Sequence, residues 1–153
     1  MATTTRSYVA LTLEQAQSLA DTRFLGASVS GFGPTPDLDG AELEEAEFAS
    51  TQLAARAAIK RGMPVLVAAL ELPLALVQAD NDAASASLAS DSAGVRPVQV
   101  NERVALSRVA ALHLADDTLE GVTLQADAAE AIDLSWYDTT EIHHVVQLLT
   151  ASH

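Results

Sequence analysis

One continuous apolar segment constrains the fold more than any other feature of the sequence. Within Met63–Leu72, the residues from Val65 to Leu70 are all apolar, and the segment is bounded by Gly62 and Pro73. A strand with one solvated face alternates apolar and polar residues, whereas an uninterrupted, partly β-branched run is typical of a strand buried on both faces. The sequence therefore predicts a central strand here, in a sheet on which helices pack.

The order of the remaining elements predicts an α/β sandwich, with an α+β fold as the alternative. Further strands are expected at Arg6–Leu11, Phe24–Ser30, Val95–Val100, Val104–Leu114 and Leu134–Tyr137. Helices are expected after Thr12, over Ala41–Arg61, in part over Ala126–Ala131, and after Asp138. We expect one domain over residues 1–153, with a mixed sheet of five or six strands and packed helices.

Two segments are expected to lie outside regular structure. Residues Gly31–Pro36 contain two glycines and two prolines, which predict a loop and not a helix or a central strand. Residues Ala79–Gly94 are almost entirely Ala, Ser, Asp and Asn, a composition typical of a flexible surface connection. The second segment is not a domain boundary, because neither half of the chain is long enough to hold a comfortable core alone.

Two short motifs predict where helices begin. Thr12 and Gln15 have the spacing of a capping box, in which two side chains satisfy free backbone N–H groups at the helix start. Asp138 and Glu141 repeat that spacing near the end of the chain, and the apolar residues after them recur at helical intervals.

The composition excludes several classes of function. The chain has no cysteine, which excludes disulfide frameworks, thiolate metal sites and cysteine nucleophiles. A net charge of −13 argues against binding to nucleic acid, because such proteins need clustered Lys and Arg. No apolar run reaches the ~18–20 residues that cross a bilayer, so we expect no membrane partner and a cytoplasmic location. No cofactor is expected.

The acidic residues are concentrated, most densely between Asp37 and Glu47. Such a run either forms a solvated helix start that suits the helix dipole, or gives an acidic surface that binds a basic partner or mimics nucleic acid. The composition is also rich in Ala and Arg and poor in Lys and Ile, which is typical of a high-GC genome such as that of an actinobacterium.

Three sets of residues are candidates for a site. In the first, His113 ends a predicted strand and is followed by Asp116 and Asp117. Imidazole and carboxylate groups bind divalent metals or act as a base and its orienting partner. The alternative is that the two acids cap the next element while His113 is half-buried on its strand.

The second set is Glu141 and His144, which stand three residues apart on the last predicted helix. They form either part of a metal site or an ordinary solvated helix face. The third set is Trp136, Tyr137 and Asp138, in a chain with few aromatic residues. The two rings either anchor the core or provide a binding surface whose polar edge is fixed by Asp138.

The sequence favours a non-enzymatic protein-interaction or accessory domain that binds a protein partner or forms a homodimer near Trp136. This expectation rests on the aromatic pair, the acidity and the lack of a recognisable catalytic motif. Two alternatives stay open, namely a small metal-dependent or hydrolytic enzyme that uses His113, Asp116 and Asp117, and the acidic mimic.

Overall fold

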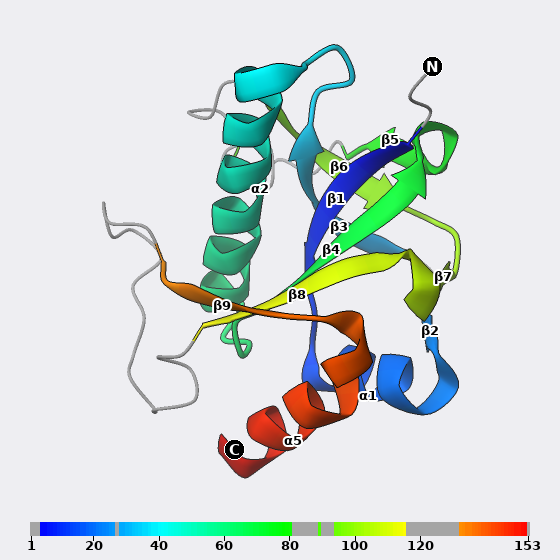
Figure 1. Ribbon diagram of the computed structural model, residues 1–153, viewed down its shortest axis with the longest axis vertical. Coiled ribbons are helices and arrows are strands. Elements are labelled where there is room, and N and C mark those ends of the chain that lie inside the picture. Colours follow the sequence, from blue (N-terminus) through cyan, green and yellow to red (C-terminus); the bar gives the residue numbers. More distant parts are fainter. Residues whose placement is uncertain (1–3, 27, 81–88, 90–93, 116–131, 153) are drawn as a thin grey trace.

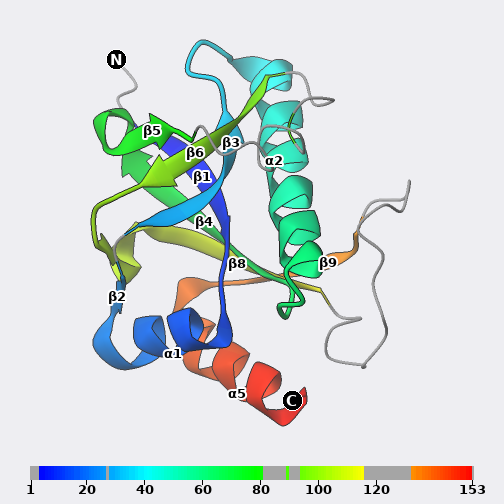
Figure 2. The same ribbon diagram turned by 180° about the vertical axis from the view of Figure 1, so that it is seen from behind.

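A computed structural model describes residues 4–26, 28–80, 89, 94–115 and 132–152, and Figures 1 and 2 show its arrangement from two sides. The helices are α1 (Leu13–Thr22), α2 (Gly40–Lys60) and α5 (Ile142–Ser152). The strands are β1 (Thr4–Ala10), β2 (Phe24–Leu25), β3 (Val29–Pro34), β4 (Leu66–Pro73), β5 (Val77–Ala79), β6 (Val95–Val100), β7 (Val104–Ala105), β8 (Val109–Ala115) and β9 (Leu134–Tyr137). None of the described helices is long and apolar enough to cross a membrane.

Seven strands form one sheet in the order β5-β6-β3-β1-β4-β8-β9, and β2 pairs with β7 in a small second sheet. The expected combination of helices packed on a sheet is confirmed. The expected strand number and mixed direction are wrong, because the sheet has seven strands and every described pair in it is antiparallel. The difference arises at the sheet margin, where the three-residue β5 is too short to leave a clear pattern in the sequence.

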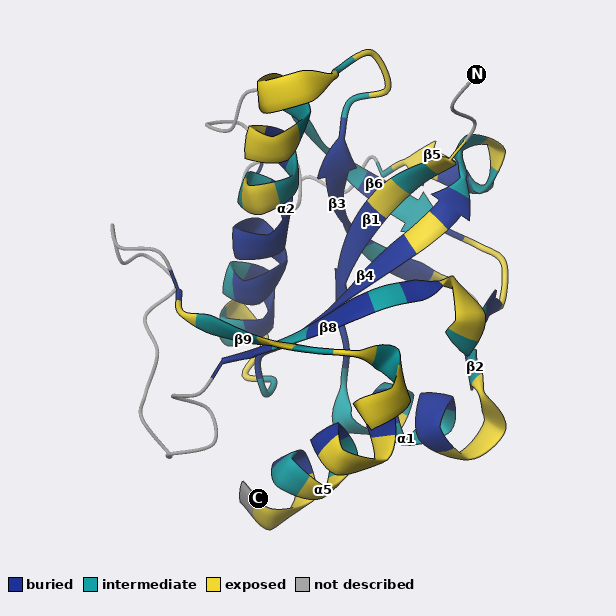
Figure 3. Cartoon of the chain, viewed as in Figure 1, coloured by how far each residue is buried: buried dark blue, intermediate teal, exposed yellow. Residues whose placement is uncertain are grey.

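The prediction of a strand buried on both faces is confirmed by β4, which lies between β1 and β8. Leu66, Ala68 and Leu70 belong to one hydrophobic cluster, and Val67 and Ala69 belong to another. Alternate side chains of a strand point to opposite faces, so the continuous apolar run supplies both layers at once. Figure 3 shows most of β4 buried, with one exposed position near its end.

Helices cover the two faces unequally. Figures 1 and 2 show α2 along one side of the twisted sheet and α1 with α5 on the other. The predicted capping boxes are both present, since Thr12 and Gln15 exchange hydrogen bonds of 2.8 and 3.0 Å at α1. Asp138 and Glu141 form the second box before α5. The two caps mark where the chain leaves β1 and β9 and begins the helical turns that follow.

The expected loop at Gly31–Pro36 is wrong, because β3 covers Val29–Pro34 inside the sheet between β6 and β1. The physical reason is the close approach of β1. A Cβ atom at residue 31 would collide with the carbonyl oxygen of Tyr8, so this position requires glycine. Pro34 ends the strand, where the missing N–H costs no interior ladder bond.

The long extended segment expected over Val104–Leu114 is interrupted. A short 3-10 helix at Leu106–Arg108 divides it into β7 and β8. Most of the expected flexible connection at Ala79–Gly94, and the expected partial helix at Ala126–Ala131, lie outside the described residues.

Candidate functional site

Among the residues that the structure describes, none covers part of the α2-side face of the sheet, and we call this part the open face. It consists of Arg6, Glu71, His113 and Trp136. Each of these residues stands two positions from a residue of the α2-side cluster on the same strand, namely Tyr8, Ala69, Ala111 and Leu134. Because strand side chains repeat with period two, all four residues point to the α2 side.

Strand register places these four residues as two separate cross-strand pairs. Arg6 lies opposite Glu71 across β1 and β4, and His113 lies opposite Trp136 across β8 and β9. Directly opposed side chains on one face of a sheet interact with each other. The residue of β4 opposite His113 is Val67, so the guanidinium–carboxylate pair and the imidazole–indole pair lie four residues apart along β4 on the same face.

Helix α2 forms one wall of the open face. Its Thr51 side chain hydrogen-bonds to that of Tyr8, and its Gln52 side chain bonds the backbone of Ile132 at 2.7 and 2.9 Å. Phe48 lies one helical turn from Thr51 and Gln52, so it is on the same side of α2 as these two residues. The Phe48 side chain is 61% exposed.

Electrostatics keep two groups at the base of this region uncharged near neutral pH. Burial, reinforced by the charge of Glu47, raises the pKa of Tyr8 to about 12, so its phenol remains protonated. Burial, followed by the positive charge of Arg6, lowers the pKa of His113, so its imidazole is neutral. The region thus offers neutral polar groups beside the exposed Arg6 and Glu71.

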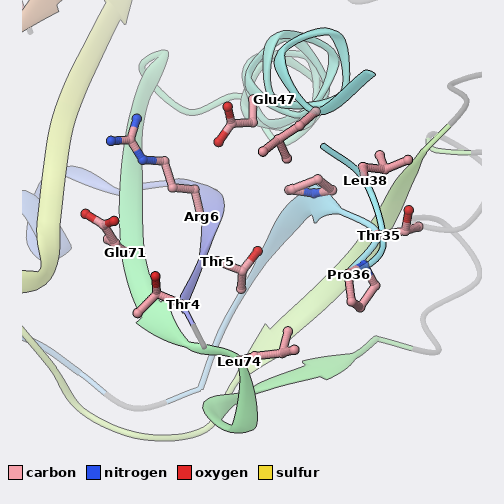
Figure 4. Close-up of a pocket in the computed structure, with 11 residues that line it drawn as sticks. Thr4, Thr5, Arg6, Thr35, Pro36, Leu38, Glu47, Glu71 and Leu74 are labelled. Atoms are coloured by element: carbon pink, nitrogen blue, oxygen red, sulfur yellow. The ribbon is translucent and has the colours of Figure 1, made fainter. Parts of the chain in front are cut away.

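A hollow of about 250 Å³ adjoins the open face where β1 and β4 meet the loop before α2. Figure 4 shows Arg6 and Glu71 on neighbouring strands, with Glu47 projecting from α2 over the same space. Threonine side chains from β1 and from the residue after β3 also line the hollow, and leucine and proline side chains form the rest of its lining. The hollow is shallow, and its charged side chains reach solvent.

The residues proposed as a metal or acid–base site are only partly described. His113 is half-buried on β8, whereas Asp116 and Asp117 lie outside the described residues. Within the described ranges, no three histidine or acidic side chains come together in a way that could hold a metal ion.

The second candidate set, Glu141 and His144, lies at the start of α5. The Glu141 carboxylate accepts a hydrogen bond of 3.0 Å from the backbone N–H of Asp138. His144 is exposed, and its ring centroid is 6.3 Å from that of Tyr137. Glu141 is therefore held as a helix cap, and His144 as the neighbour of an aromatic ring.

The third candidate set is divided between the two faces of the sheet. Trp136 belongs to the open face and is 62% exposed, whereas Tyr137 packs against the cluster on the α1 and α5 side. Asp138 forms the capping box with Glu141. Trp136 alone of the three presents a large apolar surface to solvent.

Sequence reasoning missed Arg6, Tyr8, Glu71 and Phe48 as members of this region. One available signal was Glu71, a charge that interrupts an apolar strand at a position where the facing residue of β1 is also charged. Their proximity depends on the pairing of β1 with β4, which the sequence pattern did not specify.

No curated protein and no solved structure matches this chain. Residues 5–146 match the sequence profile of a family of unknown function, DUF6912, and this match covers most of the chain and every member of the open face. The chain therefore belongs to the family DUF6912.

Proposed function

We propose that this chain is a non-enzymatic protein-interaction domain that binds its partner on the open face. The observation that carries the proposal is the exposure of Trp136 and Phe48, at 62% and 61%. Among the described residues they are the two large hydrophobic side chains that are exposed.

The exposure of these two rings is meaningful because the chain has few aromatic residues. It has three phenylalanines, two tyrosines and one tryptophan, so each ring left in water is absent from the core. Aromatic side chains contribute most of the binding energy at protein interfaces, usually from the centre of a patch with a polar rim. Arg6 and Glu71 are exposed polar residues on the same face, four residues along β4 from the row that holds His113 and Trp136.

Site-specific photocrosslinking tests the proposal in cells, where the protein and its cytoplasmic neighbours are both present. A photoreactive amino acid replaces Trp136 in one variant and Gln78 in the control, since Gln78 is exposed on β5 at the opposite margin of the sheet. We expect a discrete crosslinked protein from position 136 and none from position 78. Mass spectrometry of the adduct identifies either a different protein or a second copy of this chain.

A second variant separates binding from folding. Trp136→Ala removes an exposed ring, so the free energy of unfolding should change by less than about 0.5 kcal/mol. In a third crosslinking variant the photoreactive amino acid replaces Phe48. Trp136→Ala in this variant should abolish the adduct that forms at position 48. Equal adducts from positions 136 and 78, or an adduct at Phe48 that survives Trp136→Ala, would show that the open face is not the binding surface.

A further inference from the structure

A second hollow, of about 190 Å³, lies where the end of α2 meets the turn from β1 into α1. It shares no residue with the open face. Its polar lining comes from Thr12, Gln15, Ser28, Ser30 and Arg61. The described lining contains no carboxylate, and its one charged side chain is that of Arg61. The hollow is therefore a locally basic site.

The positive charge of this hollow contrasts with the rest of the chain. The net charge is −13, yet residues 48–70 include three basic residues and no acidic one. Arg61 is exposed, and no described residue forms an ion pair with it. A guanidinium group that has no carboxylate partner can bind an anion from solution through two parallel N–H bonds.

The neutral side chains of the lining provide further hydrogen-bond donors. In the capping box of α1, the Thr12 hydroxyl and the Gln15 side-chain carbonyl both act as acceptors, in bonds of 3.0 and 2.8 Å. The box therefore leaves the O–H of Thr12 and the side-chain NH₂ of Gln15 unused. Ser28 and Ser30 add two more hydroxyl groups beside the start of β3.

This set of donors favours a phosphate group over a carboxylate. A carboxylate has two oxygens, whereas a phosphate monoester has three terminal oxygens and a charge of about −1.5 to −2 at pH 7. One guanidinium, three hydroxyls and one amide match the larger acceptor better than the smaller one.

Volume and net charge limit the size of the ligand. The hollow of about 190 Å³ is smaller than the ~300–1,000 Å³ of pockets that enclose drug-sized molecules. A net charge of −13 repels a polyanion such as nucleic acid, whereas a single phosphate group meets mainly its local surroundings.

We infer that this hollow binds the phosphate group of a small phosphate monoester, with Arg61 as the principal binding residue. The Arg61 guanidinium donates to two phosphate oxygens, and the neighbouring hydroxyl and amide groups donate to the remaining lone pairs. This site is separate from the proposed protein-interaction surface and does not depend on it.

NMR titration of the ¹⁵N-labelled full chain tests the inference. The probes are glycerol 3-phosphate and inorganic phosphate, and the controls are glycerol and acetate, all at one ionic strength. We expect the amide signals of residues 12–15, 28–30 and 61 to shift and to saturate with both phosphate probes, in roughly the millimolar range. Glycerol 3-phosphate should bind at least as tightly as inorganic phosphate, and acetate at least about tenfold more weakly.

Substitutions at and beside the hollow separate a built site from general charge attraction. Arg61→Gln should weaken the binding of glycerol 3-phosphate at least about tenfold, and Arg61→Lys less, because lysine keeps the charge but not the paired donors. Ser30→Ala should weaken binding about threefold. Lys60→Gln is the matched control, since Lys60 is exposed on the same helix and does not line the hollow. It should change the affinity less than about twofold.

Four results would overturn the inference. They are no saturation with either phosphate probe, binding of inorganic phosphate without glycerol 3-phosphate, equal binding of acetate, and equal weakening by Lys60→Gln and Arg61→Gln. The last would indicate diffuse attraction to the basic end of α2. Circular dichroism of each variant checks that the fold is intact. Crosslinking from position 136 is independent of all four results, so the interaction function and the phosphate site fail separately.

Discussion

The two faces of the sheet exclude water with different side chains. In the described residues, nine of the fifteen buried members of the α2-side cluster are alanines, whereas the twenty-one members on the α1 and α5 side include nine leucines and three alanines. Small residues let α2 approach the sheet closely, and large ones fill the wider space under two helices and the β2–β7 pair. The Ala-rich face is also the one that leaves Trp136 and its neighbours open.

This difference predicts that the Leu-rich face is most sensitive to truncation. Leu66 is fully buried there, and Leu66→Ala should lower the free energy of unfolding by about 3 kcal/mol, because it removes contacts and leaves a cavity. Chemical denaturation monitored by circular dichroism measures the change. Leu43→Ala, at a half-exposed position of α2, is the matched control and should cost less. If both substitutions lowered the free energy of unfolding equally, the buried position would be no more sensitive to truncation than the half-exposed one.

The Ala-rich face should instead be sensitive to enlargement. Ala55 is fully buried between α2 and the sheet, and Ala55→Leu should cost about 2 kcal/mol because the added atoms force α2 away from the strands. Ala41→Leu, exposed at the start of the same helix, should change stability by less than about 0.5 kcal/mol. A neutral result for Ala55→Leu in the same denaturation measurement would show that the helix is not closely packed.

We expect pH to have a smaller effect on stability, which arises from His113 on the α2 side of the sheet. The pKa of His113 is lowered in the folded protein from its ordinary value of 6.5, chiefly by burial. The unfolded chain therefore binds the proton more readily, and stability should fall as the pH drops below 6.5. His113→Gln should flatten this part of the stability profile, whereas His143→Gln, at an exposed position, should not.

The smallest effect concerns a polar residue on the Leu-rich face. Ser7 is fully buried, and its hydroxyl oxygen has no hydrogen-bond partner among the described residues. Ser7→Ala should therefore leave stability unchanged or raise it by up to about 1 kcal/mol, because no bond is lost and an unsatisfied group is removed. A thermal melt that fell by several degrees would show that the hydroxyl has a partner in solution.

The features that were predicted correctly from the sequence depend on a few consecutive residues. The apolar run of β4 defined a strand buried on both faces, and the capping boxes at Thr12 and Asp138 located two helix starts. Features that depend on distant partners were missed. Gly31 looked like a loop residue because the need for glycine arises from Tyr8 on another strand.

The same limit applies to the candidate site. Trp136 and Tyr137 were singled out from the sequence, and strand alternation alone predicts that they face opposite sides, but only the structure shows that Trp136 is exposed while Tyr137 packs against the core. Arg6, Glu71 and His113 come from three strands whose pairing no local pattern specifies. A charged residue in a strand marks an exposed position, but it does not show which other charge lies opposite.

The exposed position of Trp136 affects how this protein is measured. It is the single tryptophan, so the intrinsic fluorescence of the chain comes mainly from one indole that already contacts water. Unfolding should therefore shift the emission wavelength very little, and a fluorescence melt would understate the transition that circular dichroism records. A binding partner that covers Trp136 would instead remove water from the indole. The emission should then shift to shorter wavelength while the fold is unchanged.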